Sequence, residues 1–186
     1  MEKVIFPYII ELDENSDKKN AKLRIIDEVS FSKSYPYAYK YLTMFKSVLS
    51  LRDKGEKQYE LWYAFGRNQA LLYSGYKLLL PYITNKPCFV YTNDRNLLFY
   101  NGYAILSDDS NALRVLEKIL MSKIFWFYIS NTSKPYAGNY FSVAKNYIKS
   151  FGVCNLTKEE ENVLLKLENK IEIDDFLSKK YGLFLE

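Results

Sequence analysis

Residues 88–106, CFVYTNDRNLLFYNGYAIL, decide the fold class of this chain. The polar segment TNDRN and the pair Asn101-Gly102 separate three short apolar runs, at 88–91, 97–100 and 103–106. Such short runs between turn residues favour strands over helices, and Asn-Gly between two apolar runs is a strong signal for a β-hairpin. The stretch therefore predicts clustered short strands, with a hairpin turn at Asn101-Gly102.

Further elements follow on both sides of this stretch. Strands are expected at 4–10, 23–26, 61–65 and 77–83, with 23–26 pairing back on 4–10. Helices are expected from apolar spacing at 41–52, 112–129, 139–150, from Thr157 onward and at 173–181. Asp108 to Ser110 offer an N-cap for the second helix, and Thr157 with Glu160 forms a capping box for the fourth.

Helices and strand clusters without βαβ alternation indicate an α+β protein. We expect a small antiparallel or mixed sheet packed with amphipathic helices. The 186 residues fit a single domain over 1–186, with an α+β body at 1–156 and a helical tail at 157–186.

Positive charge gathers in the middle of the chain. The net charge is +4, but residues 62–150 carry 10 basic and 4 acidic side chains. The preceding segment is nearly neutral and the following one is acidic, which favours one basic face directed at a polyanion. The 18 tyrosines suit a surface that is apolar and hydrogen-bonding at once, although an AT-rich genome gives the same enrichment.

The sequence lacks the residues that several kinds of chemistry require. The chain has no histidine, which excludes Ser-His-Asp and Cys-His catalysis and removes the commonest zinc ligand. No phosphate-binding glycine motif is present. Cys88 and Cys154 have no metal-ligand or disulfide-framework spacing, which fits a reducing cytoplasm. The longest apolar run, 124–129, is too short to span a membrane. We expect a cytoplasmic protein without a catalytic residue, metal ion or cofactor of its own.

Short motifs occur in series along nearly the whole chain. They are Tyr35-Pro36-x-Ala38-Tyr39-x-Tyr41-Leu42, Trp62-Tyr63 with Gly66-Arg67-x-Gln69, Lys77-Leu78-Leu79-Leu80-Pro81, Leu116-Glu117-Lys118-Ile119-Leu120-Met121-Ser122-Lys123, Gly138-Asn139-Tyr140, and Ile173-Asp174-Asp175-Phe176-Leu177 with Tyr181-Gly182-Leu183. In this order and spacing the series resembles the C-terminal target-recognition domain of TaqI-like adenine DNA methyltransferases and type IIG restriction-modification enzymes.

This resemblance implies a DNA methylase specificity-domain fold and sequence-specific binding of double-stranded DNA. The glycine-bearing S-adenosylmethionine loop and the Asn-Pro-Pro-Tyr/Phe tetrapeptide of the catalytic half do not occur here. Methyl transfer, S-adenosylmethionine and the flipped adenine are therefore expected to belong to an N-terminal methyltransferase domain or a separate catalytic subunit.

Candidate DNA-binding residues are chosen by side-chain chemistry and by their position in loops or basic segments. They are Arg67, Asn68, Gln69, Asn93, Arg95, Asn131, Lys134 and Asn139 for base edges, and Lys77, Lys123, Lys145 and Lys149 for phosphates. For each, an ordinary solvated or scaffold role is the competing interpretation; Arg67 and Gln69 in particular suit a scaffold that ties sheet to helix.

Two other functions compete with DNA recognition. A metal-dependent nuclease would use carboxylates and a lysine, but no acidic residue is followed by a Glu-x-Lys-like triplet on an expected strand. A protein-interaction domain would dock a partner through the helical tail. Cleavage that depends on divalent ions would favour the first alternative, and absent or salt-insensitive DNA binding would favour the second.

Overall fold

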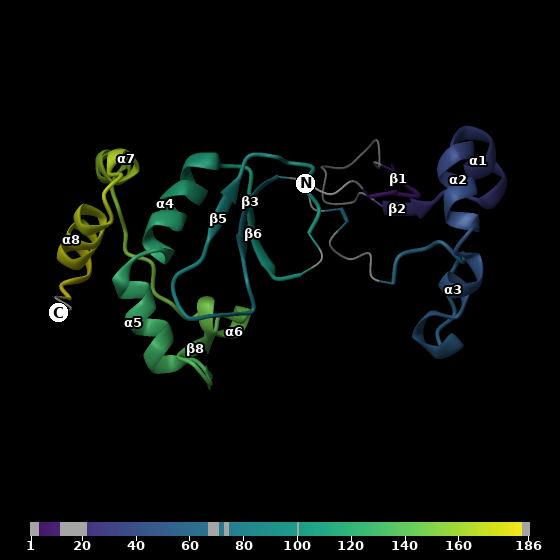
Figure 1. The fold of residues 1–186 in the computed structure, drawn as a ribbon. Helices are drawn as coiled ribbons and strands as arrows, with labels where there is room; N and C mark the ends of the chain where they lie inside the picture. The colour runs from purple at the N-terminus through teal and green to yellow at the C-terminus, as the bar shows by residue number, and fades with distance from the viewer. Residues whose placement is uncertain (1–3, 12–21, 67–70, 73–74, 100, 184–186) are drawn as a thin grey trace. The chain divides into compact units, whose positions relative to one another are not determined.

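The structure is a computed structural model that describes residues 4–11, 22–66, 71–72, 75–99 and 101–183. The chain divides into two compact units, Met1–Leu72 and Tyr73–Glu186. Each unit combines helices with short antiparallel strands around a core of its own (Figure 1). The α+β class expected from the sequence is therefore confirmed.

The first unit is a hairpin followed by helices. Its elements are β1 (Tyr8–Glu11), β2 (Lys22–Ile25), α1 (Glu28–Ser34), α2 (Pro36–Thr43), α3 (Lys46–Ser50) and the 3-10 turn η2 (Arg52–Gly55). β1 and β2 pair antiparallel, as predicted. The Asp27 side chain caps α1 by accepting a hydrogen bond from the amide of Ser30 at 2.9 Å. α1 was missed by the sequence analysis.

The run 61–65 is not a strand, in contrast to the prediction. It fills the core of the first unit, where Tyr63 and Ala64 are buried with residues of the hairpin and α1. The hydroxyl of Tyr63 donates to the carbonyl of Ile26 at 2.6 Å, and the amide of Phe65 donates to the hydroxyl of Tyr8 at 2.5 Å. Side chains thus attach this apolar run to the hairpin without a strand ladder.

The second unit contains two small sheets and five helices among its described residues. Its elements are β3 (Tyr76–Leu80), β4 (Ile83–Thr84), β5 (Val90–Thr92), β6 (Tyr103–Ser107), α4 (Ser110–Leu120), α5 (Lys123–Thr132), β7 (Pro135–Tyr136), β8 (Tyr140–Ser142), α6 (Lys145–Ile148), α7 (Lys158–Lys166) and α8 (Lys170–Tyr181). The strand orders are β5-β3-β6 and β4-β8-β7, all antiparallel.

The β5-β3-β6 sheet packs against α4 and α5 (Figure 1). Leu78 and Leu80 of β3 are buried there with Leu120 and Phe125 of the two helices. The predicted hairpin at Asn101-Gly102 is wrong, because β6 pairs with β3 and the described residues 97–99 form no strand. The partner of β6 is thus the central strand β3, which begins 27 residues earlier in the chain.

Two helix predictions also need correction. The expected helix 112–129 is two helices, because Ser122 ends one and caps the next by accepting a hydrogen bond from the amide of Phe125 at 3.3 Å. The expected helix 139–150 begins as strand β8 and becomes helical only at α6. β8 forms here because β4 and β7 both pair with it.

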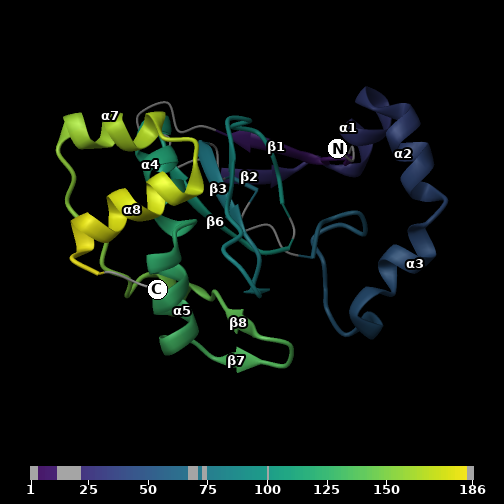
Figure 2. The ribbon, with the colours of Figure 1, turned by 60° about the vertical axis from the view of Figure 1, so that its left-hand side comes forward.

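The C-terminal helices belong to the second unit. α7 packs on α4 and α8 packs on α5, around buried Leu164 and Leu177 (Figure 2). The predicted capping box is confirmed, with the Thr157 side chain accepting from the amide of Glu160 and the Glu160 carboxylate accepting from the amide of Thr157. Asp174 of α8 accepts a hydrogen bond from the amide of Lys123 at 2.8 Å, which joins the tail to the start of α5.

Candidate nucleic-acid interface

The β4-β8-β7 sheet has one exposed face that carries two tyrosines. Tyr136 pairs with Tyr140, and Ile83 pairs with the residue two positions after Tyr140. Since side chains alternate along a strand, these three residues share one face, and all three are exposed. The other face carries Phe141, whose ring lies edge-on to Trp126 at 5.6 Å between centroids. Packing on α5 thus holds the small sheet and leaves its tyrosine face to solvent.

The segment around this sheet has only positive charges. Between Glu117 and Glu159 the chain carries six lysines and no acidic residue. Lys134, Lys145 and Lys149 are exposed, and the ammonium of Lys134 lies 5.3 Å from the ring centroid of Tyr136. β7 pairs with β8, and both β8 and α6 pack on α5 (Figure 1). We call the exposed sheet residues together with the three exposed lysines of this segment the hairpin surface, defined by Ile83, Tyr136, Tyr140, Lys134, Lys145 and Lys149.

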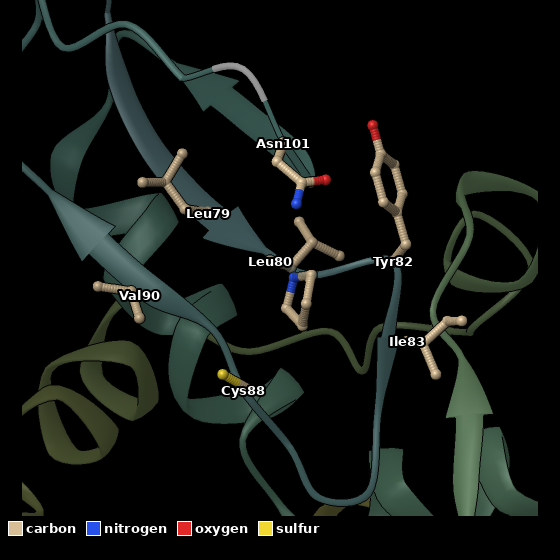
Figure 3. Close-up of a pocket in the computed structure, with 9 residues that line it drawn as sticks. Leu79, Leu80, Tyr82, Ile83, Cys88, Val90 and Asn101 are labelled. Carbon is tan, nitrogen blue, oxygen red and sulfur yellow. The ribbon is translucent and has the colours of Figure 1, made fainter. Parts of the chain in front are cut away.

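An apolar hollow adjoins the hairpin surface (Figure 3). Its volume is about 540 Å³, and it is lined by Leu79, Leu80, Pro81, Tyr82, Ile83, Cys88, Val90, Asn101 and Gly102. Asn101 and Tyr82 stand side by side at one edge. The ring of Tyr82 is fixed edge-on against Tyr103 at 4.6 Å between centroids. The hollow therefore offers mainly apolar contact, with one amide and one phenol as polar groups.

Lys77 is not a surface cation, which corrects its assignment as a phosphate contact. It is 1% exposed, and its ammonium donates to the carbonyls of Gly75 at 3.1 Å and Arg95 at 2.7 Å. Burial lowers the pKa of Lys77. The side chain thus binds the 92–96 loop to β3 from the inside.

Arg95 has a comparable structural role. Its guanidinium forms an ion pair with Asp108 at 2.6 Å and lies 5.2 Å from the ring centroid of Tyr76. The loop that carries it is held by two turns, in which Thr92 and Asp94 side chains accept hydrogen bonds from backbone amides two residues later. Asn93 of the same loop is exposed.

The other candidate DNA-binding residues do not all lie in one place in the second unit. Lys134 directly precedes β7, Asn139 occupies the β7–β8 turn with a positive φ of 58°, and Lys145 begins α6. Asn131 lies near the end of α5, and its amide nitrogen donates to the carbonyl of Phe127 at 2.7 Å. Lys123 is partly buried at the start of α5. Arg67, Asn68 and Gln69 lie outside the described residues.

Sequence reasoning missed Tyr136 and Tyr140 because it treated 130–139 as a loop and 139–150 as a helix. A signal was present, since Gly138-Asn139 between aromatic residues is a turn pair of the kind that joins two strands. The described residues contain no cluster of three or more His, Cys, Asp or Glu side chains able to hold a metal ion. No helix in this part of the chain is long and apolar enough to cross a membrane.

The fold and this surface together define an α+β protein whose second unit presents a basic, tyrosine-bearing sheet face. No protein-family model matches the chain, and no curated protein matches its sequence.

Proposed function

We propose that this chain is a DNA target-recognition domain, or a separate specificity subunit, of an adenine DNA methyltransferase or restriction-modification enzyme. The observation that carries the proposal is the hairpin surface, where exposed lysines flank two exposed tyrosines in a segment without any carboxylate. The serial resemblance of the sequence to TaqI-like target-recognition domains names the enzyme class. The methyl transfer itself belongs to another domain or chain.

The charges of the hairpin surface suit phosphate contacts. Lys134 precedes β7 and Lys145 follows β8, so both lie toward the open end of the hairpin, and Lys149 follows one helical turn after Lys145. Lysine side chains on phosphates set the register of a protein on a duplex and make its affinity fall with salt. The absence of nearby carboxylates in the sequence removes the repulsion that phosphates would otherwise meet.

The polar tip of the hairpin suits base contacts. A two-stranded β-ribbon fits the major groove, and an asparagine amide pairs with the N6 and N7 atoms of adenine. Asn139 sits at the turn of the ribbon, between two exposed tyrosines. The adjoining hollow offers apolar contact of the kind that a thymine methyl group makes.

The first test is binding of the full chain to random duplex DNA across a salt series. The variant K134Q/K145Q/K149Q removes three charges from the hairpin surface, and K158Q/K166Q/K179Q removes three exposed charges from the tail helices. If the three hairpin lysines contact phosphates, the log-log salt slope falls by about 2.7 in the first variant. The second variant keeps the original slope.

Two results would contradict the proposal. One is the absence of binding at low salt for the full chain and for a fusion to a methyltransferase domain. The other is an equal fall of the salt slope in both triple variants, which would reflect the net charge of the protein alone. The base-contact role is tested by N139G, which removes the amide and keeps the positive φ of the turn. It should relax the preferred DNA sequence without changing the salt slope.

A further inference from the structure

Five large apolar residues form an exposed line along α2 and α3 of the first unit. They are Tyr37, Tyr41, Met44, Val48 and Leu51, and each is between 54% and 89% exposed. Their spacing of 4, 3, 4 and 3 residues is that of one helix face in a coiled-coil contact. We call this line the stripe.

α2 ends at Thr43 and α3 begins at Lys46, and the turn at Met44 and Phe45 separates them (Figure 2). The amide of Phe45 donates to the carbonyl of Leu42 at 2.9 Å, and the amide of Leu49 donates to the carbonyl of Phe45 at 2.9 Å. Within α2, Tyr37 and Tyr41 are four residues apart and therefore lie about 40° apart around the helix axis. The stripe thus runs over two successive helices, with Met44 in the turn between them and Leu51 at the end of α3.

The core of the first unit uses a different face of the same helices. Ala38, Tyr39 and Leu42 pack against the buried cluster formed around Phe31 and Tyr63. The stripe residues are not among the side chains that line this core. An apolar row of this size, apart from the core that the helix already serves, is characteristic of a protein-binding surface.

The segment of sequence that carries the stripe is positively charged. Between Glu28 and Asp53 the chain carries Lys33, Lys40, Lys46 and Arg52 and no acidic residue. Lys46 forms an ion pair with Glu28 at 3.2 Å. No ion pair of Lys33 or Lys40 occurs within the described part of the chain. Carboxylates on a partner would therefore meet cations beside the stripe.

We infer that the stripe is a docking face for an amphipathic helix of another protein, with an apolar seam and flanking Asp or Glu residues. A second copy of this chain fits less well, because a two-fold contact sets the same patch against itself and brings its lysines together. A nucleic acid also fits less well, because large apolar side chains would cover phosphates without offering them hydrogen bonds. This inference does not depend on DNA binding.

The test uses two designed 21-residue helical peptides with leucine at every a and d position. One carries glutamate at all flanking e and g positions, and the other carries lysine there. Binding of each labelled peptide to the full chain is followed by fluorescence anisotropy. We expect the glutamate peptide to bind at least tenfold more tightly than the lysine peptide. M44D/V48D should reduce that binding at least tenfold, whereas V163D, on the exposed part of α7, should not.

Four outcomes overturn the inference: no binding of the glutamate peptide, equal binding of both peptides, binding that M44D/V48D leaves unchanged, or a dimer of the free chain that M44D/V48D dissociates. Peroxide oxidation of Met44, read by mass spectrometry, provides a second measurement on the unmodified protein. Met44 should oxidise readily in the free chain and be protected when the glutamate peptide is bound. Protection in the free chain would show that the stripe is already covered.

Discussion

The indole nitrogen of Trp62 donates a hydrogen bond to the carboxylate of Glu28 at 2.9 Å, across 34 residues of sequence. The same carboxylate oxygen accepts from the hydroxyl of Tyr39 at 2.8 Å and from the ammonium of Lys46 at 3.2 Å. One side chain at the start of α1 therefore joins α2, α3 and the apolar run after η2. These hydrogen bonds, led by that from Trp62, lower the pKa of Glu28.

Replacing Glu28 by glutamine should lower the free energy of unfolding of the first unit by about 1 kcal/mol at neutral pH. The three hydrogen bonds to this side chain then lose their charged acceptor, and because water reaches the site, the loss is modest. A carboxyl group whose pKa is lower in the folded state stabilises the fold at pH values above its unfolded-state pKa. This stabilisation disappears as the pH falls through the folded-state pKa. The difference between wild type and E28Q should thus vanish in acid. Urea unfolding at several pH values measures it, and a pH-independent difference would contradict this account.

Asp174 should be essential for docking the tail. Its carboxylate accepts from the amide of Lys123 at 2.8 Å and from the ammonium of Lys170 at 2.9 Å. D174A leaves the first amide of α5 without this acceptor and should lower the free energy of unfolding by about 2 kcal/mol. D175A, at the exposed neighbouring position, should cost less than about 0.5 kcal/mol. Hydrogen exchange of α8 amides separates the two variants, and equal exchange would exclude this role for Asp174.

Gly102 should not tolerate a side chain. Its φ is 97°, and an added Cβ would lie 2.5 Å from the backbone carbonyl oxygen of Leu80. We expect G102A to lower the free energy of unfolding by about 3 kcal/mol, because of backbone strain and the clash of the added Cβ with Leu80. At Gly182, φ is 63° but nothing lies within 4 Å of an added Cβ, so G182A should cost about 1 kcal/mol. Thermal unfolding of both variants tests this order, and a smaller loss in G102A would contradict it.

Tyr63 should contribute to alkaline unfolding. Burial raises its pKa to about 12, and its hydroxyl donates to the carbonyl of Ile26. A tyrosine whose pKa is higher in the folded state stabilises the fold at pH values below its ordinary pKa near 10. This stabilisation is lost as the pH rises toward 12. Y63F should be less stable than wild type at pH 7 by about 1 kcal/mol, and the difference should shrink above pH 10. Unfolding followed by circular dichroism tests this, and a constant difference would refute it.

Local signals in the sequence predicted some elements well. The capping box at Thr157 and Glu160 was confirmed because both of its hydrogen bonds close within four residues. The cap at Asp109 and the pairing of β1 with β2 were also predicted. In each case the interacting groups are close in sequence or follow one apolar pattern.

Long-range pairing was predicted less well. The Asn101-Gly102 pair indicated a local hairpin, yet β6 pairs with β3. The strand β8 was taken for a helix from its apolar spacing, which does not reveal its pairing with β7 directly before it or with β4 about 60 residues earlier. Lys77 was assigned to the surface on its residue type, whereas its position in a central strand buries it.

The sequence by itself determined the α+β class, the concentration of lysines without carboxylates between Glu117 and Glu159, and the helix starts that are set by nearby caps. The tertiary structure decided that Lys134 is the lysine that lies over the ring of Tyr136, and which aromatic side chains are buried. The physical reason is that a cap or a charge run depends on neighbours within a few residues. Burial and strand pairing depend on apolar contacts between segments that only folding brings together.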